Sequence, residues 1–131
     1  MSWPVLARMW RSQIPRLLKE IRRQVIAKSS AVIQGDSKVC RVAECEMSNL
    51  VADAMIDRVA DQGAQIAITN LGGLRASIDV GDVTMGKILT VLPFQNTLAT
   101  FQISGQGLID ALENGVSQVR EPKVGFHRLP V

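Results

Sequence analysis

An apolar run leads directly into a glycine-containing loop in the stretch Gln65-Ile66-Ala67-Ile68-Thr69-Asn70-Leu71-Gly72-Gly73-Leu74-Arg75. The run at 65–69 is short, partly β-branched and bounded by turn residues, so it predicts a buried strand. Two adjacent glycines allow a sharp turn and let a ligand approach the main chain. Exposed N–H groups of such a loop can hold an anion, and Arg75 can bind a phosphate with paired hydrogen bonds. The alternative is a tight turn between strands with Arg75 on the surface.

Helical patterns lie on both sides of this stretch. Residues 47–60 predict a helix that ends near Gly63 and whose apolar stripe is Met47, Leu50, Val51, Ala54, Met55 and Val59. Residues 84–92 predict a second helix, with Thr84 as its N-cap and Pro93 ending it. Residues 97–104 then suit a strand and residues 105–116 a helix.

The N-terminal third continues the alternation of helix and strand. Apolar residues at helical spacing predict a helix over 14–26 with Pro15 in its first turn. Residues 25–33 suit a strand, and residues 34–37 form a turn by composition. We therefore predict an α/β fold, a single domain with a mixed or parallel sheet flanked by helices.

Length and composition limit the class of protein. The chain has 131 residues, enough for one core, and its 47% hydrophobic and 21% charged residues indicate a globular protein. No apolar run reaches the roughly 18 residues that a membrane-spanning helix needs. Arg8 and Arg11 interrupt the apolar segment at the start, so we expect no signal peptide in this chain.

The charge is distributed unevenly along the chain. Residues 1–28 carry seven basic residues against one acid, whereas residues 29–131 carry eight basic residues against eleven acids. We therefore divide the chain into a basic amphipathic helix at 1–28 and a domain at 29–131. The helix either binds nucleic acid or an anionic membrane, or docks through its apolar side; we favour docking.

Three further positions are candidates for chemistry. Arg41 precedes the helix at 47–60 and could help to bind an anion; the alternatives are a solvated Arg41 or an ion pair with Glu44. Phe94 follows Pro93 in a predicted loop and could stack on a nucleobase, unless it lies in the core. Cys40 and Cys45 either form a small disulfide or remain reduced.

Metal sites are not expected in this chain. Two cysteines are too few for a thiolate zinc site. A two-metal phosphohydrolase site needs several His, Asp and Asn ligands, whereas His127 is the only histidine and is expected to be exposed and idle. We expect the chain not to hydrolyse phosphate esters by itself.

Three segments together resemble the C-terminal domain of the 5′-nucleotidase family. They occur in the family's order and spacing: Cys40-Arg-Val-Ala-Glu-Cys-Glu-Met-Ser-Asn-Leu-Val-Ala-Asp-Ala-Met55, Ile66-Ala-Ile-Thr-Asn-Leu-Gly-Gly-Leu-Arg-Ala-Ser-Ile78 and Val83-Thr-Met-Gly-Lys-Ile-Leu-Thr-Val-Leu-Pro-Phe-Gln-Asn-Thr97. The likeness runs from about Val25 to about Ser117. It favours the functional interpretation of each candidate over its alternative.

The resemblance implies a role for each candidate residue. Arg41 and Arg75 would contact the phosphate of a nucleoside monophosphate, Asn70 and the backbone of Gly72 and Gly73 would line the pocket, and Phe94 would stack on the base. Some family members have a disulfide at the positions of Cys40 and Cys45. The chain requires no cofactor of its own, because the family's divalent metal pair is held by a separate N-terminal domain.

The resemblance also implies a context and some differences. Family members hydrolyse nucleotides and are usually periplasmic or extracellular, so the expected partners are a nucleotide and a metallophosphoesterase domain or chain. Relative to the family pattern, this domain would be truncated at its C-terminus. Leu71 replaces the first of three successive glycines after the loop Asn, and Ser48 replaces a separate glycine that precedes the Asn of the first helix. An unpaired sheet edge makes a homo-oligomer a further candidate assembly, or leads to poor folding and aggregation.

Overall fold

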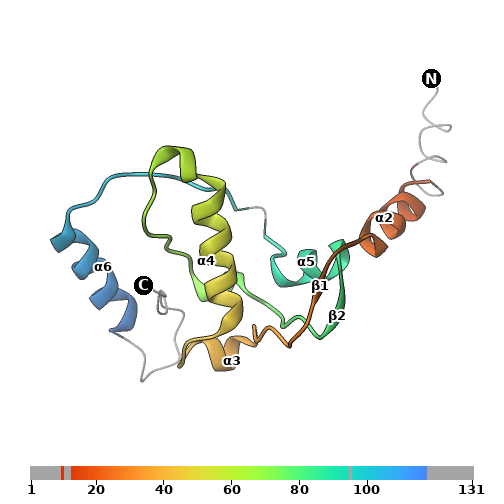
Figure 1. The fold of residues 1–131 in the computed structure, drawn as a ribbon, viewed down its shortest axis with the longest axis horizontal. Coiled ribbons are helices and arrows are strands. Elements are labelled where there is room, and N and C mark those ends of the chain that lie inside the picture. The colour runs from red at the N-terminus through yellow and green to blue at the C-terminus, as the bar shows by residue number, and fades with distance from the viewer. Residues whose placement is uncertain (1–9, 11–12, 95, 118–131) are drawn as a thin grey trace.

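The computed structural model describes residues 10, 13–94 and 96–117 (Figure 1). Helices alternate with extended segments, which confirms the α/β class. In chain order the elements are α2 (Ile14–Arg23), β1 (Val25–Ser29), α3 (Ser37–Cys40), α4 (Glu46–Arg58), η1 (Ala60–Gln62), η2 (Leu71–Gly73), β2 (Gly81–Thr84), α5 (Met85–Val91) and α6 (Gly105–Val116). Helices α2 and α6 lie at opposite ends of the molecule in Figure 1.

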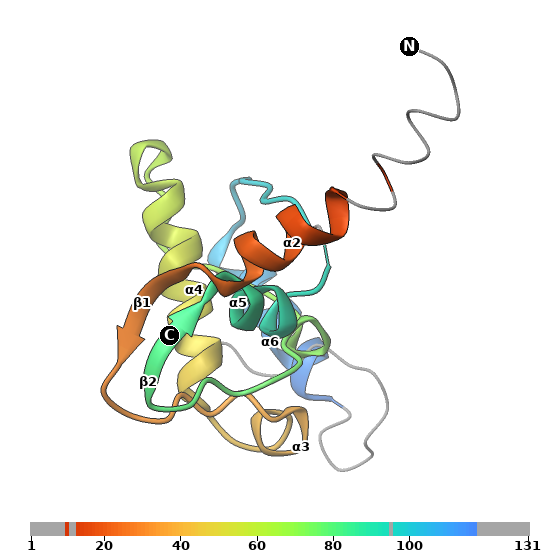
Figure 2. The same cartoon turned by 90° about the vertical axis from the view of Figure 1, so that its right-hand side faces the viewer.

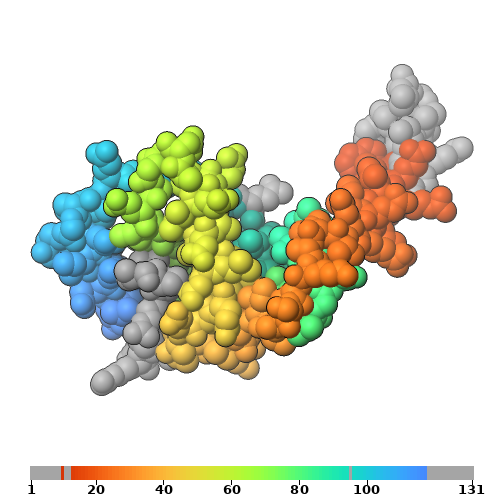
Figure 3. Space-filling model, in the orientation of Figure 1, coloured from red at the N-terminus to blue at the C-terminus, as the bar shows by residue number. Residues whose placement is uncertain are grey.

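Helix α2 projects from the rest of the molecule, as the space-filling view shows (Figure 3). Pro15 lies in its first turn as predicted, but the helix ends at Arg23 and the strand begins at Val25. Helix α2 touches α5 (Figure 2). Gly86 of α5 allows this close approach, because a Cβ atom on residue 86 would lie only 2.8 Å from the carbonyl oxygen of Arg22. The apolar side chains Leu17, Leu18 and Ile21 of α2 are nevertheless exposed. In the described part of the chain, α2 thus contacts α5 and leaves these three apolar side chains exposed, and its docking through the apolar side stays a prediction.

The sheet in the described part of the chain is a two-stranded antiparallel ribbon. Its register pairs Val25 with Thr84 and Ser29 with Gly81, with an irregularity between Val25 and Ala27. An isolated bridge between Ile33 and Ile78 extends the pairing, with reciprocal backbone hydrogen bonds of 2.9 and 3.0 Å. Strand β2 was not predicted, because glycine and aspartate at its start are typical of turns.

The strands predicted at 65–69 and 97–104 are wrong for the described structure, because neither segment forms a ladder there. An apolar run is compatible with a strand, but a strand also needs a neighbour about 4.8 Å away with matching register. Both segments instead line one cavity. Local sequence could not reveal this, because it depends on which segments meet in space.

Helix α4 forms where it was predicted, but its buried face matches the predicted stripe only in part, with Met47 buried and Val51 packed against the core. Leu50 and Ala54 of the predicted stripe are exposed, whereas Ser48 and Ala52 are buried. Apolar residues lie around much of this helix, so periodicity alone does not select the face that packs. After η1, Gly63 adopts a left-handed conformation (φ 70°) and ends the helical segment as predicted.

The helix caps agree with the sequence. The Oγ1 atom of Thr84 accepts a hydrogen bond from the backbone N–H of Lys87 at 3.3 Å, so Thr84 caps α5 as predicted. Ser104 caps α6 in the same way through Gly107, at 3.1 Å. Helix α6 begins and ends at the predicted residues, Gly105 and Val116.

One cluster of buried residues holds these elements together. Its members come from α3, α4, η2, the following loop, β2 and α5: Cys40, Cys45, Met47, Leu71, Leu74, Ile78, Val83 and Val91. The loop before α3 is attached to this cluster by hydrogen bonds, since Ser77 Oγ donates to Gln34 Oε1 at 2.6 Å and accepts from Gly35 N at 2.9 Å. The core thus lies beneath the glycine loop at 71–73.

Candidate functional site

Arg41 and Asn70 are each held by an adjacent residue in the core. Cys40, directly before Arg41, and Leu71, directly after Asn70, both belong to the buried cluster. Helix α3, which ends beside Arg41, packs against the η2 turn that begins after Asn70. The core therefore brings these two residues, 29 positions apart in the sequence, to adjoining elements.

Arg75 and Phe94 also follow closely on buried members of the same core. Leu74 is buried directly before Arg75, and Val91 is buried at the end of α5, three residues before Phe94. A backbone hydrogen bond of 3.0 Å from the N–H of Arg75 to the carbonyl of Val91 joins the two segments. Arg75 is exposed and Phe94 is 55% exposed, so both side chains are available to a ligand.

The glycine loop is a turn of 3-10 helix. Backbone hydrogen bonds from Gly73 to Asn70 and from Leu74 to Leu71, each 3.1 Å, close the turn. Neither glycine has a positive φ, so the turn does not require glycine for its backbone conformation. Space is tight only at Gly73, where a Cβ would lie 3.2 Å from Asn70 Oδ1, whereas a Cβ at Gly72 would make an ordinary contact of 3.6 Å with Asn70 Nδ2. The amide of Asn70 therefore lies over both glycines.

Leu71, which replaces a glycine of the family pattern, is buried in the core. Its side chain anchors the loop from below. It therefore does not occupy the exposed side on which Gly72 and Asn70 lie.

Arg41 is half-buried at the C-terminal end of α3, not at the N-terminus of α4, where Cys45 is the N-cap. Its predicted alternative partner, Glu44, accepts a hydrogen bond from Asn49 Nδ2 at 2.9 Å. Within the described residues no ion pair joins Arg41 to Glu44. The ion pair found in that part of the chain links Lys28 to Asp82, at 3.7 Å. The guanidinium of Arg41 is thus not committed to that acid.

Cys40 and Cys45 form a disulfide that joins the end of α3 to the N-cap of α4. Both cysteines are buried in the core cluster. The short loop between them carries Arg41. The covalent link therefore limits the positions that the backbone of Arg41 can adopt.

Asn49 in the first half of α4 is a polar residue that sequence reasoning did not select. Its Oδ1 atom is buried, and within the described residues it has no hydrogen-bond partner. A buried acceptor of this kind normally has a partner. The only sequence signal was a polar side chain next to the apolar stripe of the helix, which is too common to single out.

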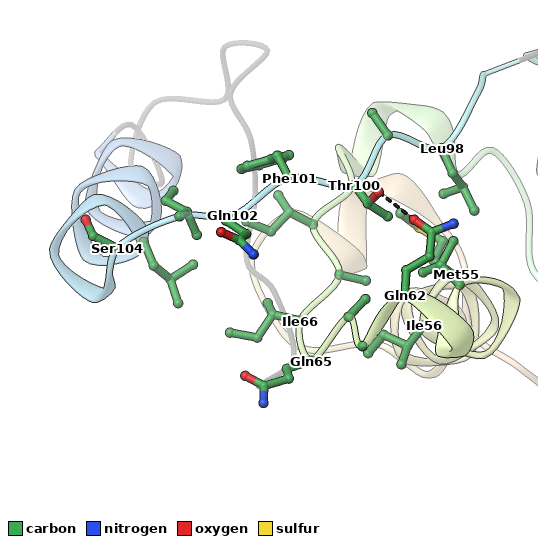
Figure 4. Close-up of a pocket in the computed structure, with 18 of the residues that line it drawn as sticks. Met55, Ile56, Gln62, Gln65, Ile66, Leu98, Thr100, Phe101, Gln102 and Ser104 are labelled. Atoms are coloured by element: carbon green, nitrogen blue, oxygen red, sulfur yellow. Dashed lines mark hydrogen bonds between the residues drawn. The ribbon is translucent and has the colours of Figure 1, made fainter.

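A cavity of about 850 Å³ lies elsewhere in the molecule (Figure 4). Two segments, 55–68 and 98–108, supply its lining residues, and none of the six candidate residues is among them. No acidic or basic side chain lines it among the described residues. The paired hydrogen bonds that an arginine gives a phosphate are therefore not offered by this part of the lining.

No metal centre is apparent in the described ranges 13–94 and 96–117, where no three His, Cys, Asp or Glu side chains are grouped to hold an ion. His127 lies outside the described residues. The described helices are also too short or too polar for any of them to cross a membrane.

Comparison with known proteins identifies the fold. The family model of the 5′-nucleotidase C-terminal domain matches residues 25–127. The chain is 37% identical over 108 residues to a trifunctional nucleotide phosphoesterase of Bacillus subtilis, with 82% of this chain and 7% of that protein covered. It is 35% identical over 103 residues to the 5′-nucleotidase of Homo sapiens, with 71% and 18% covered.

A solved structure agrees with these matches. The 5′-nucleotidase precursor of Thermus thermophilus superposes with a TM-score of 0.80 and 38% identity, over 93% of this chain and 23% of that one. The chain therefore spans less than a quarter of the length of each of these three proteins.

Proposed function

Because the chain belongs to the family of the 5′-nucleotidase C-terminal domain, we propose that it forms the part of a nucleotide-hydrolysing enzyme that binds the phosphate and base of the substrate. The observation that supports this is the shared core beneath the candidate residues. Each candidate side chain belongs to a residue within three positions of a buried member of one cluster: Arg41, Asn70, Arg75 and Phe94.

The phosphate is bound by two guanidinium groups in this proposal. Arg75 is exposed just after the glycine loop, and Arg41 ends the helix that packs against the same loop. Guanidinium groups match phosphate oxygens with paired, charge-assisted hydrogen bonds. Gly72 has no Cβ beside the exposed Asn70 amide, so a ligand can approach that amide and the main chain of Gly72, whereas Gly73 is buried and its N–H closes the turn.

The base stacks on Phe94 in this proposal. The ring is 55% exposed, so one of its faces is open to solvent. Its backbone lies three residues after Val91, the buried end of α5. A half-exposed aromatic ring can stack on any base, because every base has a π face.

Hydrolysis is assigned to a metal-bearing domain or a separate chain. Such a site would supply the divalent metal pair, and this chain would hold the nucleotide against it. The disulfide between Cys40 and Cys45 supports a periplasmic or extracellular location, because disulfides persist in oxidising compartments. An interaction module acting through residues 1–28 is not favoured, because the family match begins at residue 25.

Isothermal titration with adenosine 5′-monophosphate tests the phosphate contacts. Replacing Arg75 by Ala, or Arg41 by Ala, is expected to weaken binding about tenfold or more, because each removes charged hydrogen bonds of about 1.5–3 kcal/mol. Arg58→Ala is the matched control, since Arg58 is an exposed arginine at the end of α4, away from the candidate residues. Binding that survives the double variant Arg41→Ala/Arg75→Ala would defeat the assignment.

Two partial ligands separate phosphate binding from base binding. Inorganic phosphate should compete with the nucleotide in the wild type and in Phe94→Ala, but not in Arg75→Ala. Adenosine should compete in the wild type and in Arg75→Ala, but lose affinity with Phe94→Ala, since stacking contributes about 1–3 kcal/mol. If Phe94→Ala leaves adenosine affinity unchanged, the base is bound elsewhere.

A further inference from the structure

Glu44 lies in the same short loop as Arg41. The disulfide between Cys40 and Cys45 closes this loop, with the two Cα atoms 5.2 Å apart. Arg41 and Glu44 are three positions apart in the sequence, so their Cα atoms lie at most about 11 Å from each other. Extended arginine and glutamate side chains can span that distance. These two opposite charges are therefore able to pair.

A carboxylate so placed is a competitor for the phosphate. Both anions match the planar fork of an arginine with paired hydrogen bonds. An ion pair between Arg41 and Glu44 would therefore weaken the phosphate contact that we propose for Arg41. These two described residues form no ion pair with each other, and Glu44 binds helix α4 instead.

The side chain that binds Glu44 is Asn49 of α4. Its Nδ2 atom donates to Glu44 Oε1 at 2.9 Å. A hydrogen bond to an ionised acceptor is stronger than one between neutral groups. The bond ties the carboxylate to the helix that follows the loop, on a residue that belongs to none of the proposed substrate contacts.

The first turn of α4 holds Asn49 in place. Its backbone N–H donates to the carbonyl of Cys45, the N-cap of the helix, at 3.3 Å. Met47 and Ser48, which precede it, are buried, and Ser48 Oγ donates to the same carbonyl at 2.7 Å. The Oδ1 atom of Asn49 is buried too. The amide is thus inserted by one end and presents its Nδ2 atom to the loop.

We propose that Asn49 is a positioning residue for the phosphate site: its amide holds the Glu44 carboxylate on α4 and so leaves the Arg41 guanidinium available to the substrate. The inference rests on the proposed function, since it needs Arg41 to bind the phosphate. Asn49 acts through Glu44 and touches no substrate. Its removal should therefore matter only while residue 44 carries a negative charge.

Isothermal titration with adenosine 5′-monophosphate on the full chain tests this. Asn49→Ala is expected to weaken binding about two- to fivefold, the size of effect that an exposed ion pair produces when it competes with the ligand. Glu44→Gln should change the affinity less than about twofold, because the carboxylate is already held away from Arg41 and exposed charges are screened. The double variant Asn49→Ala/Glu44→Gln should bind like Glu44→Gln. Asn114→Ala, which removes an exposed asparagine of α6, is the matched control.

Rescue by the second substitution separates positioning from support of the fold. A loss that is equal with glutamate and with glutamine at position 44 would mean that Asn49 only supports the fold, and it overturns the proposal. An affinity that Asn49→Ala leaves unchanged overturns it as well. Glu44→Gln alone needs no change at Asn49. If Asn49→Ala does not fold, a several-fold gain in affinity with Glu44→Gln still overturns the proposal, because Glu44 would then already compete in the wild type.

Arg41→Ala in the same titration distinguishes this inference from the proposed function. If Arg41→Ala weakens binding and Asn49→Ala does not, the positioning role of Asn49 alone is overturned. A wild type without affinity for the nucleotide, or one whose affinity Arg41→Ala leaves unchanged, overturns the proposed phosphate contact and this inference with it.

Discussion

Gly35 occupies a position with no room for a side chain. A Cβ atom there would collide with the carbonyl oxygen of Ala76 and lie 3.1 Å from the side chain of Met47. The close approach lets the N–H of Gly35 donate to Ser77 Oγ at 2.9 Å. Gly35 was assigned from the sequence only as part of a turn. Its need for glycine comes from a contact with a segment some forty residues away.

Gly35→Ala is expected to destabilise the fold by about 1–3 kcal/mol, because the backbone must shift to accept the methyl group. Urea unfolding followed by circular dichroism measures the change. Gly105→Ala is the control, since nothing lies within 4 Å of a Cβ at Gly105, and alanine is a better helix former. Equal stability of Gly35→Ala and the wild type would show that the loop at 34–36 rearranges at no cost.

At the scale of elements, α3 and α4 are joined both covalently and by packing. The disulfide between Cys40 and Cys45 closes a loop with a sequence separation of 5 residues, and Met47 of α4 is buried against the same core. A short loop loses little chain entropy when it is closed, so the stabilisation from this link is modest. The backbone N–H of Met47 also donates to the carbonyl of Gln34 at 3.0 Å.

We expect Cys40→Ala/Cys45→Ala to lose about 2 kcal/mol of unfolding free energy, from the loop-closure relation for so short a loop. Urea titration with and without a reducing agent checks this. The reductant should lower the stability of the wild type towards that of the variant and leave the variant unchanged. A wild type that is insensitive to the reductant while fully reduced would contradict the prediction.

At the scale of the whole molecule, two distinct surfaces emerge from one short chain. The candidate nucleotide residues adjoin the core formed by α3, η2 and α5, whereas the cavity lies between the end of α4 and the start of α6 (Figure 4). Helix α2 extends from the side of the molecule that carries the two-stranded sheet of β1 and β2 (Figure 3). The candidate residues and the cavity can therefore be altered by separate mutations.

The purified chain is expected not to release phosphate from adenosine 5′-monophosphate when Zn²⁺ or Mn²⁺ is added. The chain has one histidine, and a two-metal site needs several His, Asp and Asn ligands that converge on both ions. A colorimetric phosphate assay measures turnover, with a complete 5′-nucleotidase as the positive control. Metal-dependent turnover that remains after repeated purification would refute the ligand argument.

The local features of this protein follow from its sequence alone. The capping of α5 by Thr84 and the two ends of α6 were predictable, because a helix cap or a helix end depends on residues within about one turn. The three family segments were recognisable for a similar reason, since each is a continuous motif. The association of the chain with nucleotide hydrolases needed no coordinates.

Tertiary structure decided what depends on distant neighbours. It selected the buried face of α4, exposing Leu50 and burying Ala52. It paired β1 with β2 and left 65–69 and 97–104 as the walls of a cavity. Pairing and burial are properties of segments that meet in space, and many partners are compatible with one apolar run. The core beneath the glycine loop was therefore visible only once the chain had folded.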